Sequence, residues 1–441
     1  MRFFSLKLFS YFKNCRSEAK NLTAPSGFCF CWGGVKANCG VTRGKVMYEV
    51  RILEHLAADF GENHIETSPH LLRIGWSMVH ASLQLGEEQD SWGYGGTGKF
   101  STNNKFSDYG EAYTIGDVIT AFLDLDSKPA SISFAKNGLW LGVASPLHGF
   151  KVDQKSHAMF PHILSKNCRF EVNFGQQSSW CPVQYVNHDH VFINNISPMY
   201  TAPGPKPPQS KSDCEVIMVV GLPGSGKTTW ARKMFRDHPE KMYNIIGTDD
   251  LIDKMKVMGL PRKNNYSGRW EVLIQQATSC LNKIFFIASR KLRHYIIDQT
   301  NVYATARKRK MKNFVGFKRI CAVLQPEDDE LKRREWKRTF EEGKVVPEEA
   351  VMEMKMNYSL PDAEVDEHID EVIWIELGKD ASCQLVNQYN EEGSLKLPSR
   401  KRLSSTSLPN NSNNSSNNNS SSNNNVRTKI YYMHLSSCHF L

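Results

Sequence analysis

The sequence predicts a multidomain protein: an all-β sandwich, then an α/β domain with a phosphate-binding loop, then a disordered Asn/Ser-rich tail. Three observations predict this. Short apolar runs separated by turn residues fill much of the N-terminal half. Near the middle, a glycine-rich Lys-Thr motif lies between an apolar run and a helical pattern. From Asn410 to Asn425 every residue is Asn or Ser, a composition that cannot bury apolar surface.

The size and composition of the chain are those of a globular protein with more than one domain. It has 441 residues, of which 40% are hydrophobic and 23% charged, so it can bury a core. No stretch approaches the roughly 18–20 uncharged apolar residues of a membrane span, and we therefore expect no integral membrane association. The net charge of +9 permits binding to a polyanion without demonstrating it.

The 11 cysteines are scattered and include no Cys-x-x-Cys pair. Cys29 and Cys31 are the one close pair, and they lack the second pair that a zinc site needs. This pattern predicts reduced thiols in a cytosolic or nuclear protein.

Residues 1–27 form a basic, aromatic N-terminal leader with no acidic residue before Glu18. Lys7 interrupts the apolar run that a secretory signal needs. The pattern fits a mitochondrial presequence better, and that reading stays open beside a leader with no targeting role.

Residues 28–185 read as the β-sandwich. Val46–Val50 and Val118–Phe122 are typical short strands. Asn137-Gly138 stands between two further apolar runs, and Asn-Gly is the strongest short hairpin signal.

A Pro-rich linker, residues 198–213, separates the sandwich from the α/β domain at residues 214–378. In that domain strands alternate with helical stretches, which predicts a parallel sheet covered by helices. The expected strands are Val216–Val220, Tyr295–Ile297 and Ile320–Leu324. Residues 379–441 are expected to form a disordered tail.

The segment Gly221-Leu-Pro-Gly-Ser-Gly-Lys-Thr228 matches the phosphate-loop pattern and has the required strand before it and helix after it. Its backbone N–H groups curl around phosphate oxygens, Lys227 supplies a positive charge, and the Thr228 hydroxyl is suited to Mg²⁺. We therefore predict ATP and Mg²⁺ as cofactors. The predicted ATP-binding residues are Gly221, Gly224, Ser225, Gly226, Lys227, Thr228 and Thr229.

Asp298 and the pair Asp249-Asp250 are candidates for completing a phosphoryl-transfer site. Asp298 ends an apolar strand, where P-loop proteins carry the acid that holds Mg²⁺, so Thr228 and Asp298 form the predicted metal site. Asp249 and Asp250 precede a helical stretch. One of them caps that helix or acts as a base toward a phosphate acceptor, and both readings stay open.

A basic helical segment runs from Lys332 to Arg338. Arg334 and Arg338 are four residues apart and share a helix face, so they are suited to close over a phosphate as a lid. The alternative is an ordinary solvated charged face.

The P-loop segment and its surroundings resemble the kinase module of 5′-polynucleotide kinases, on the strings GLPGSGKTTWARKMF, YNIIGTDD and YIIDQTN. The resemblance implies that Lys227 binds ATP, that Asp249 activates a 5′-hydroxyl, and that Arg334 and Arg338 contact phosphates as catalytic lid residues. The chain departs from that pattern at Ile252, where these kinases carry an Arg that holds the substrate.

A second resemblance covers residues 28 to about 378. The β region is similar to a SPRY domain, on motifs such as Arg73-Ile-Gly-Trp76 and Phe160-Pro-His162. SPRY followed by this P-loop domain resembles the heterogeneous nuclear ribonucleoprotein U-like family, closest to the U-like protein 1 branch. Strings that carry the resemblance are Val272-Leu-Ile-Gln-Gln276, Asp298-Gln-Thr-Asn-Val302 and Asn357-Tyr-Ser-Leu-Pro361.

This resemblance implies a nuclear RNA-binding protein involved in pre-mRNA processing, with protein partners bound through the SPRY domain. The family's SAP helices and Arg/Gly-rich segment are not found in this sequence, and an Asn/Ser tract carries no charge to replace the latter. RNA binding is therefore expected at basic clusters: Arg307–Lys310, Lys332–Arg338 and Arg400–Arg402. Arg400–Arg402 also fits a short nuclear-localisation patch.

Three functional readings follow. The first is an RNA-associated nuclear protein whose P-loop domain binds ATP. The second is an active ATP-dependent 5′-hydroxyl polynucleotide kinase, favoured by Asp249, since Asp accepts a proton where many members of the family carry Asn. The third is a pure interaction module with a vestigial P-loop.

Overall fold

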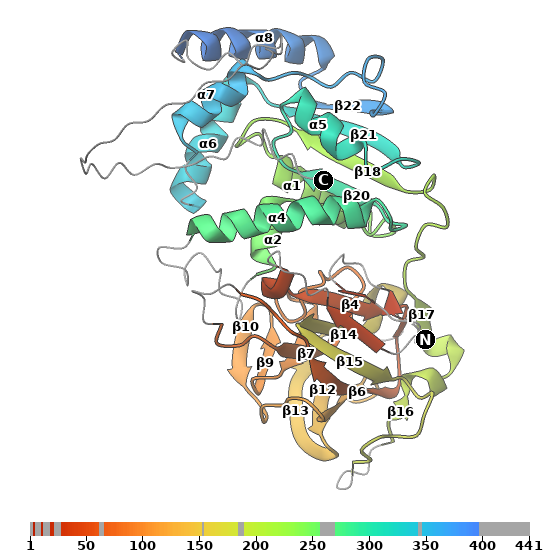
Figure 1. The fold of residues 1–441 in the computed structure, drawn as a ribbon. Coiled ribbons are helices and arrows are strands. Elements are labelled where there is room, and N and C mark those ends of the chain that lie inside the picture. The colour runs from red at the N-terminus through yellow and green to blue at the C-terminus, as the bar shows by residue number, and fades with distance from the viewer. Residues whose placement is uncertain are drawn as a thin grey trace, which may run out of the picture.

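The computed structural model describes residues 3–4, 10–11, 18–21, 28–60, 66–151, 154–183, 189–255, 270–342 and 346–396. A β-sandwich and an α/β domain lie one above the other in Figure 1, and the short helix η1 (Phe28–Phe30) lies at their junction. Both predicted domain classes are confirmed.

The sandwich consists of two largely antiparallel sheets. The first has the order β1-β4-β14-β7-β8-β9-β10, with β5 and β17 added at β14. Its strands are β1 (Phe3–Phe4), β4 (Gly33–Ala37), β5 (Cys39–Val41), β7 (Leu71–Met78), β8 (Ser91–Gly95), β9 (Lys99–Thr102), β10 (Lys105–Asp108), β14 (Met159–Lys166) and β17 (Thr201–Pro203).

The second sheet has the order β13-β12-β11-β6-β15-β3-β2, with β16 beside β6. Its strands are β2 (Ser10–Tyr11), β3 (Glu18–Asn21), β6 (Lys45–His55), β11 (Val118–Asp124), β12 (Ala130–Lys136), β13 (Leu139–Leu147), β15 (Cys168–Asn173) and β16 (Val191–Phe192). Short 3₁₀ turns connect some strands: η2 (Lys155–His157), η3 (Ile193–Asn195) and η4 (Pro198–Tyr200).

The Asn-Gly hairpin is confirmed between β12 and β13. Asn137 and Gly138 have φ of +51° and +82°, the left-handed pair that a tight hairpin needs.

The expected borders of the sandwich need correction. The described strands β1 and β3, from the leader, pair with β4 and β15. At the other end, β17 pairs with β5 inside the expected linker, and Ala202 is buried there. Backbone pairing to an existing sheet edge, which composition does not reveal, draws both flanks into the sandwich.

The α/β domain is built on a fully parallel sheet of order β19-β20-β18-β21-β22. Its strands are β18 (Glu215–Val220), β19 (Asn244–Ile246), β20 (Tyr295–Asp298), β21 (Lys318–Gln325) and β22 (Glu371–Glu376). Its helices are α1 (Lys227–Asp237), α2 (Thr248–Asp253), α4 (Trp270–Ala288), α5 (Ala304–Met311), α6 (Asp328–Glu342), α7 (Glu348–Met356) and α8 (Lys379–Lys396).

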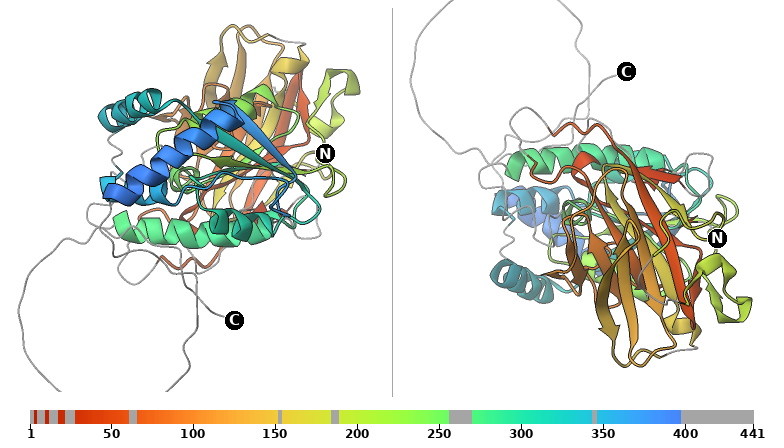
Figure 2. Two further views of the ribbon diagram at one scale, coloured as in Figure 1. Left: turned by 90° about the horizontal axis from the view of Figure 1, so that it is seen from above. Right: turned by 90° about the horizontal axis from the view of Figure 1, so that it is seen from below.

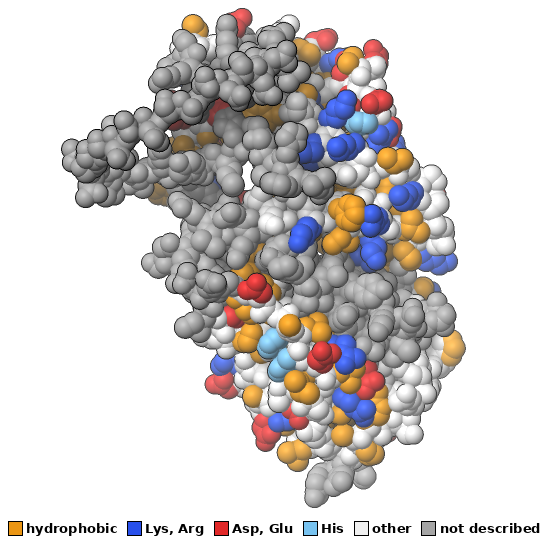
Figure 3. Space-filling view, viewed as in Figure 1, with side chains coloured by type: hydrophobic (Ala, Val, Ile, Leu, Met, Phe, Trp, Pro, Cys, Tyr) orange, Lys and Arg blue, Asp and Glu red, His pale blue; other side chains and the backbone are white. Residues whose placement is uncertain are grey.

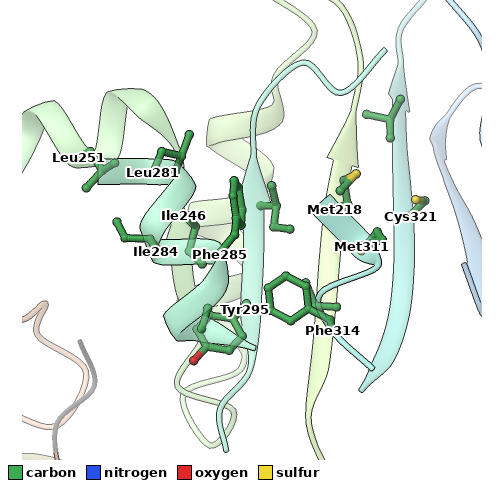
Figure 4. Close-up of a cluster of buried hydrophobic side chains, with 14 of the residues drawn as sticks. Met218, Ile246, Leu251, Leu281, Ile284, Phe285, Tyr295, Met311, Phe314 and Cys321 are labelled. Atoms are coloured by element: carbon green, nitrogen blue, oxygen red, sulfur yellow. The ribbon is translucent and has the colours of Figure 1, made fainter. Parts of the chain in front are cut away.

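Alternate residues of β18 are buried against opposite layers, as expected for a strand covered on both faces. Val216, Met218 and Val220 share a core with α4 and α5, whereas Ile217 and Val219 pack in the core of α1. Figure 4 shows Phe285 of α4, Met311 of α5 and Phe314 gathered on the first side, beside Met218.

The predicted start of the disordered tail, at residue 379, is wrong. Residues 379–396 form α8, whose Val386 and Tyr389 are buried against the rest of the P-loop domain. The spacing of the apolar residues in this segment is that of an amphipathic helix. The polar composition of the segment suggested disorder instead. The Asn/Ser tract lies outside the described residues.

The two domains share buried side chains. Phe30 lies in the core cluster of the α/β domain and makes an edge-to-face contact with Phe60, with ring centroids 5.0 Å apart. The Trp32 N–H donates to the Lys254 carbonyl just after α2, at 2.9 Å. Cys29 and Cys31 are buried in the same cluster, so this pair serves packing.

No helix in the described part of the chain is long and apolar enough to cross a bilayer.

Candidate functional site

The predicted phosphate loop leaves the carboxyl end of β18 and runs directly into α1. Gly224 and Gly226 have φ of +83° and +99°, where a side chain is strained. A Cβ on Gly221 would lie 2.6 Å from the Leu324 carbonyl oxygen. Glycine at these positions therefore allows a backbone path in which a side chain would be strained or would clash.

Lys227 opens α1 with its ammonium group inside the loop. Its Nζ donates to the Leu222 carbonyl at 2.6 Å and to Ser225 Oγ at 3.4 Å. Burial is the main cause that lowers the pKa of Lys227 to about 8, with Arg338 acting in the same direction and Asp298 opposing. Both hydrogen-bond acceptors are neutral oxygens, which phosphate oxygens can replace.

Thr228 and Asp298 meet as the sequence predicts. The Thr228 hydroxyl donates to Asp298 Oδ2 at 2.7 Å. Burial raises the pKa of the Asp298 carboxyl, while the Thr228 hydrogen bond and Lys227 oppose that rise. A hydroxyl and a carboxylate at the mouth of the loop are oxygen ligands of the type that Mg²⁺ prefers, so the residues fit this ion.

Asp249 and Asp250 lie in the first turn of α2, and the N-cap of this helix is Gly247. Neither aspartate is the N-cap, so the capping reading is wrong, although both acids suit the positive end of the helix. Asp249 is exposed and close enough to influence the titration of both Lys227 and Asp298. Ile252 is 8% exposed and belongs to the core, so it offers nothing to a substrate phosphate.

The helix α6 lies over the loop, as the lid reading expects. Arg334 Nη1 donates to the Ser225 carbonyl at 3.0 Å, and a Cβ on Gly224 would lie 2.6 Å from Glu335 Cγ. Arg338 acts electrostatically on Lys227 from the same helix. The structure thus brings both arginines to the loop.

Two carboxylates that sequence reasoning missed hold Arg334. Glu376 accepts from Nη1 and Nη2 at 2.9 and 3.1 Å, and Glu330 accepts from Nε at 2.6 Å. Side-chain hydrogen bonding to Glu376 raises the pKa of Arg334. Glu330 lies at i−4 on the helix and was visible in the sequence, whereas Glu376 lies at the end of a distant strand and gave no signal.

Asn301 is a second residue whose role only the fold reveals. Its Nδ2 donates to the Val219 carbonyl at 2.7 Å and its Oδ1 accepts from Lys310 Nζ at 2.5 Å. This bracing ties the turn after Asp298 to the strand that enters the phosphate loop.

Of the three basic clusters predicted to bind RNA, the two that the structure describes differ in burial and ion pairing. In Arg307–Lys310 the first and last residues are buried and hydrogen-bonded to backbone or Asn301, so only the middle two face solvent. In Lys332–Arg338, Lys332 and Arg333 pair with Asp328 and Glu330 of their own helix. Arg400–Arg402 lies outside the described residues.

The two SPRY-like motifs of the sandwich, Arg73–Trp76 and Phe160–His162, lie mostly in its core. Trp76 and His162 are fully buried, and Arg73 is 5% exposed with its guanidinium 5.4 Å from the Trp32 ring centroid. They identify the fold without defining a surface for a partner.

Comparisons with known proteins agree with this architecture. The family model of the SPRY domain matches residues 45–177, and that of an AAA domain matches residues 216–361. The chain is 38% identical over 375 residues to heterogeneous nuclear ribonucleoprotein U-like protein 2 of Mus musculus, which covers 84% of this chain and 49% of that protein. The Homo sapiens protein of the same name is also 38% identical, over 84% of this chain and 48% of the relative.

Shorter matches concern single parts. The ATP-dependent RNA helicase DDX1 of Xenopus laevis is 37% identical over 33% of this chain and 17% of that protein. The crystal structure of the SPRY domain of human HERC1 matches at 19% identity and a TM-score of 0.27, covering 36% of this chain and 90% of that chain. The chain spans about half the length of the two U-like relatives that it matches.

Proposed function

The chain is a relative of the heterogeneous nuclear ribonucleoprotein U-like proteins over both of its folded domains, and on this premise we propose that it is a nuclear, RNA-associated protein involved in pre-mRNA processing. In the proposal its P-loop domain binds ATP with Mg²⁺ and its SPRY domain docks a protein partner. The assignment of the chain to the U-like protein 1 branch is a separate prediction.

The observation that carries the ATP proposal is the complete phosphate loop. Gly221, Gly224 and Gly226 give the backbone its path, and the buried Lys227 ammonium lies inside it. The loop amides and the start of α1 donate to the phosphates, together with Ser225 and Thr229. On binding, Lys227 exchanges the Leu222 carbonyl for phosphate oxygens.

Thr228 and Asp298 are the proposed holders of Mg²⁺, through their hydroxyl and carboxylate oxygens. The ion would supply positive charge to the β- and γ-phosphates. The protein itself holds these two side chains in contact through the hydrogen bond from Thr228 to Asp298.

Arg334 links nucleotide binding to conformation. It contacts the loop at Ser225 while Glu376 and Glu330 hold its guanidinium. Phosphates compete with these carboxylates for the same donors, so ATP favours a different position of α6 over the loop.

The polynucleotide kinase is the second candidate, and the exposed Asp249 beside Lys227 and Asp298 favours it. In that reaction Asp249 takes the proton of a 5′-hydroxyl, the oxygen attacks the γ-phosphorus, and ADP leaves. The buried Ile252 weighs against it, because the substrate arginine of the kinases is missing there.

Calorimetric titration of the purified chain with ATP and Mg²⁺ tests the proposed ATP binding by the P-loop domain. We expect Lys227→Ala to weaken ATP binding at least 100-fold, because the phosphates no longer meet a buried positive charge. Lys233→Ala is the matched control on the same helix, since Lys233 is exposed and pairs with Asp237. Equal affinity in wild type and Lys227→Ala would reject the ATP site.

Two further measurements separate the candidates. Transfer of label from γ-labelled ATP to a 5′-hydroxyl RNA, abolished in Asp249→Ala, would establish the kinase. ATP binding without transfer favours the RNA-associated protein, and crosslinking to RNA in cells tests that association. Binding of neither ATP nor RNA would leave an interaction module.

A further inference from the structure

One side of the P-loop domain carries positively charged side chains that pair with no carboxylate among the residues that the structure describes. Between Lys283 and Lys318 the one acidic residue is Asp298, whose carboxylate lies at the phosphate loop. Five exposed cations of this stretch form what we call the α4–α5 basic surface. They are Lys283, Arg290, Lys291, Lys308 and Lys312.

The two helices that carry this surface lie against the same face of the sheet. Phe285 of α4 packs in one core with Met311 of α5 (Figure 4), and Lys310 Nζ lies 6.0 Å from the Phe285 ring centroid. Figure 2 shows α4 along an outer edge of the P-loop domain. In Figure 3, Lys and Arg side chains gather over the α4–α5 side, with few acidic side chains between them.

Pairing distinguishes these cations from several other lysines of the domain. Lys233 pairs with Asp237, Lys241 with Glu215, and Lys396 with Glu392. Among the described residues, none of the five cations of the α4–α5 basic surface forms an ion pair. Their charge is therefore available to an external polyanion.

Exposed apolar groups lie among the charges. Phe286 is 54% exposed, and the Arg290 guanidinium carbon lies 3.7 Å from its ring centroid. Leu292 and Val315 are exposed on the segments that follow α4 and α5. An aromatic ring stacked with a guanidinium, beside exposed lysines, has the chemistry that binds a base and the phosphates on either side of it.

We propose that the α4–α5 basic surface binds single-stranded nucleic acid, with phosphates on its lysines and a base stacked on the Phe286–Arg290 pair. The proposal rests on the RNA association proposed above and refines it by placing it on the P-loop domain. The surface combines Lys283 of α4, Arg290 and Lys291 of the turn that follows α4, Lys308 of α5, and Lys312 just after α5, so no single basic cluster of the sequence describes it.

The test uses the full chain and fluorescence anisotropy with a fluorescein-labelled 20-residue oligouridylate. The triple variant Lys291→Gln, Lys308→Gln, Lys312→Gln should bind at least 10-fold more weakly at 150 mM salt. Its slope of log affinity against log salt, which is negative, should become shallower by about 0.7 for each phosphate that the variant no longer neutralises. The matched control is Lys233→Gln, Lys241→Gln, Lys396→Gln, which removes the same charge from ion-paired positions and should change affinity less than 2-fold.

A second pair of variants isolates stacking. Phe286→Ala should weaken binding several-fold without changing the salt slope, because it removes a ring and no charge. Phe340→Ala removes another exposed phenylalanine, on α6, and should have no effect. Thermal melts of every variant verify folding.

Other outcomes would overturn the proposal. If wild type binds and both triple variants weaken equally, the site lies elsewhere, although the RNA-associated function stands. If the wild-type chain binds no oligouridylate, both the nucleic-acid surface and the proposed RNA association are wrong. ATP binding is tested separately by its own titration. If polyglutamate displaces the oligonucleotide at equal charge concentration, the surface serves acidic proteins and the assignment to nucleic acid is wrong.

Discussion

At the residue scale, burial decides what each charged group does. Lys227 is buried with a phosphate loop around it, whereas Lys308 and Lys312 have the same side chain and face solvent. Lys310 stands between those two in sequence and is buried, donating to Asn301. A basic run thus divides into a structural part and a part available to a partner.

Lys310 gives a pH prediction. Burial first, and Arg309 second, lower its pKa from 10.5 to about 7. Between pH 7 and 10.5 the unfolded chain holds a proton that the folded protein has released, so the free energy of unfolding rises with pH in this window, by at most about 1.4 kcal/mol per pH unit.

Urea unfolding at pH 7, 8 and 9 measures this contribution in Lys310→Met. The stability of wild type relative to the variant should increase from pH 7 to pH 9. Lys308→Met, two residues away and exposed, should show no such trend. A difference between wild type and Lys310→Met that does not vary with pH would contradict the assignment.

At the element scale, contacts between distant segments override local preference. The helix α8 lies where composition predicts a tail, because Val386 and Tyr389 find a core to join. Lys355 Nζ donates to Glu392 at 2.7 Å, and Asn390 donates to the Tyr358 carbonyl at 3.1 Å, so polar groups also fasten α8 to the α7 region.

Gly393 marks the closest approach of these helices. A Cβ there would lie 2.6 Å from Met356 N and 2.7 Å from the Met352 carbonyl oxygen. Helix propensity alone predicts that Gly393→Ala stabilises by about 1 kcal/mol. We expect the opposite, a loss of about 1–3 kcal/mol, because the backbone of α7 must move.

Urea unfolding of Gly393→Ala decides between these signs. Leu395→Ala changes an 86% exposed side chain of the same helix and should shift stability by less than about 0.5 kcal/mol. A gain of stability in Gly393→Ala would show that α8 does not pack as described.

At the scale of the whole molecule, the sandwich and the P-loop domain are joined by more than a linker. Phe30 lies between strands β3 and β4 of the sandwich yet is fully buried in the P-loop domain's core cluster. The Trp32 N–H bonds to the Lys254 carbonyl beside α2, the helix that carries Asp249. The sandwich is therefore in direct contact with the end of the helix that carries Asp249.

Phe30→Ala should destabilise the P-loop domain by about 3–5 kcal/mol, the usual cost of truncating a buried phenylalanine. Limited proteolysis with mass spectrometry locates the effect, and cleavage should increase in residues 214–396. Leu139→Ala, at a half-exposed position of the sandwich hairpin, is the control. Unchanged cleavage of the P-loop domain would contradict the shared core.

Local features of the fold could be predicted from residues that are adjacent in the sequence. An Asn-Gly pair demands left-handed backbone at two residues, and a phosphate loop needs glycines followed by Lys227 and Thr228, so both are readable from adjacent positions. The strands at Val216–Val220 and Tyr295–Ile297 followed from continuous apolar runs, and Asp298 followed from its place at a strand end.

Contacts between distant parts of the chain could not be predicted in this way and became visible in the folded structure. The tertiary structure joined Glu376 to Arg334, buried Arg307 and Lys310 while leaving Lys308 exposed, and folded α8 onto α7. The physical reason is that burial and ion pairing are set by groups that lie far apart in sequence. No local pattern of charge or hydrophobicity contains that information until the chain has folded.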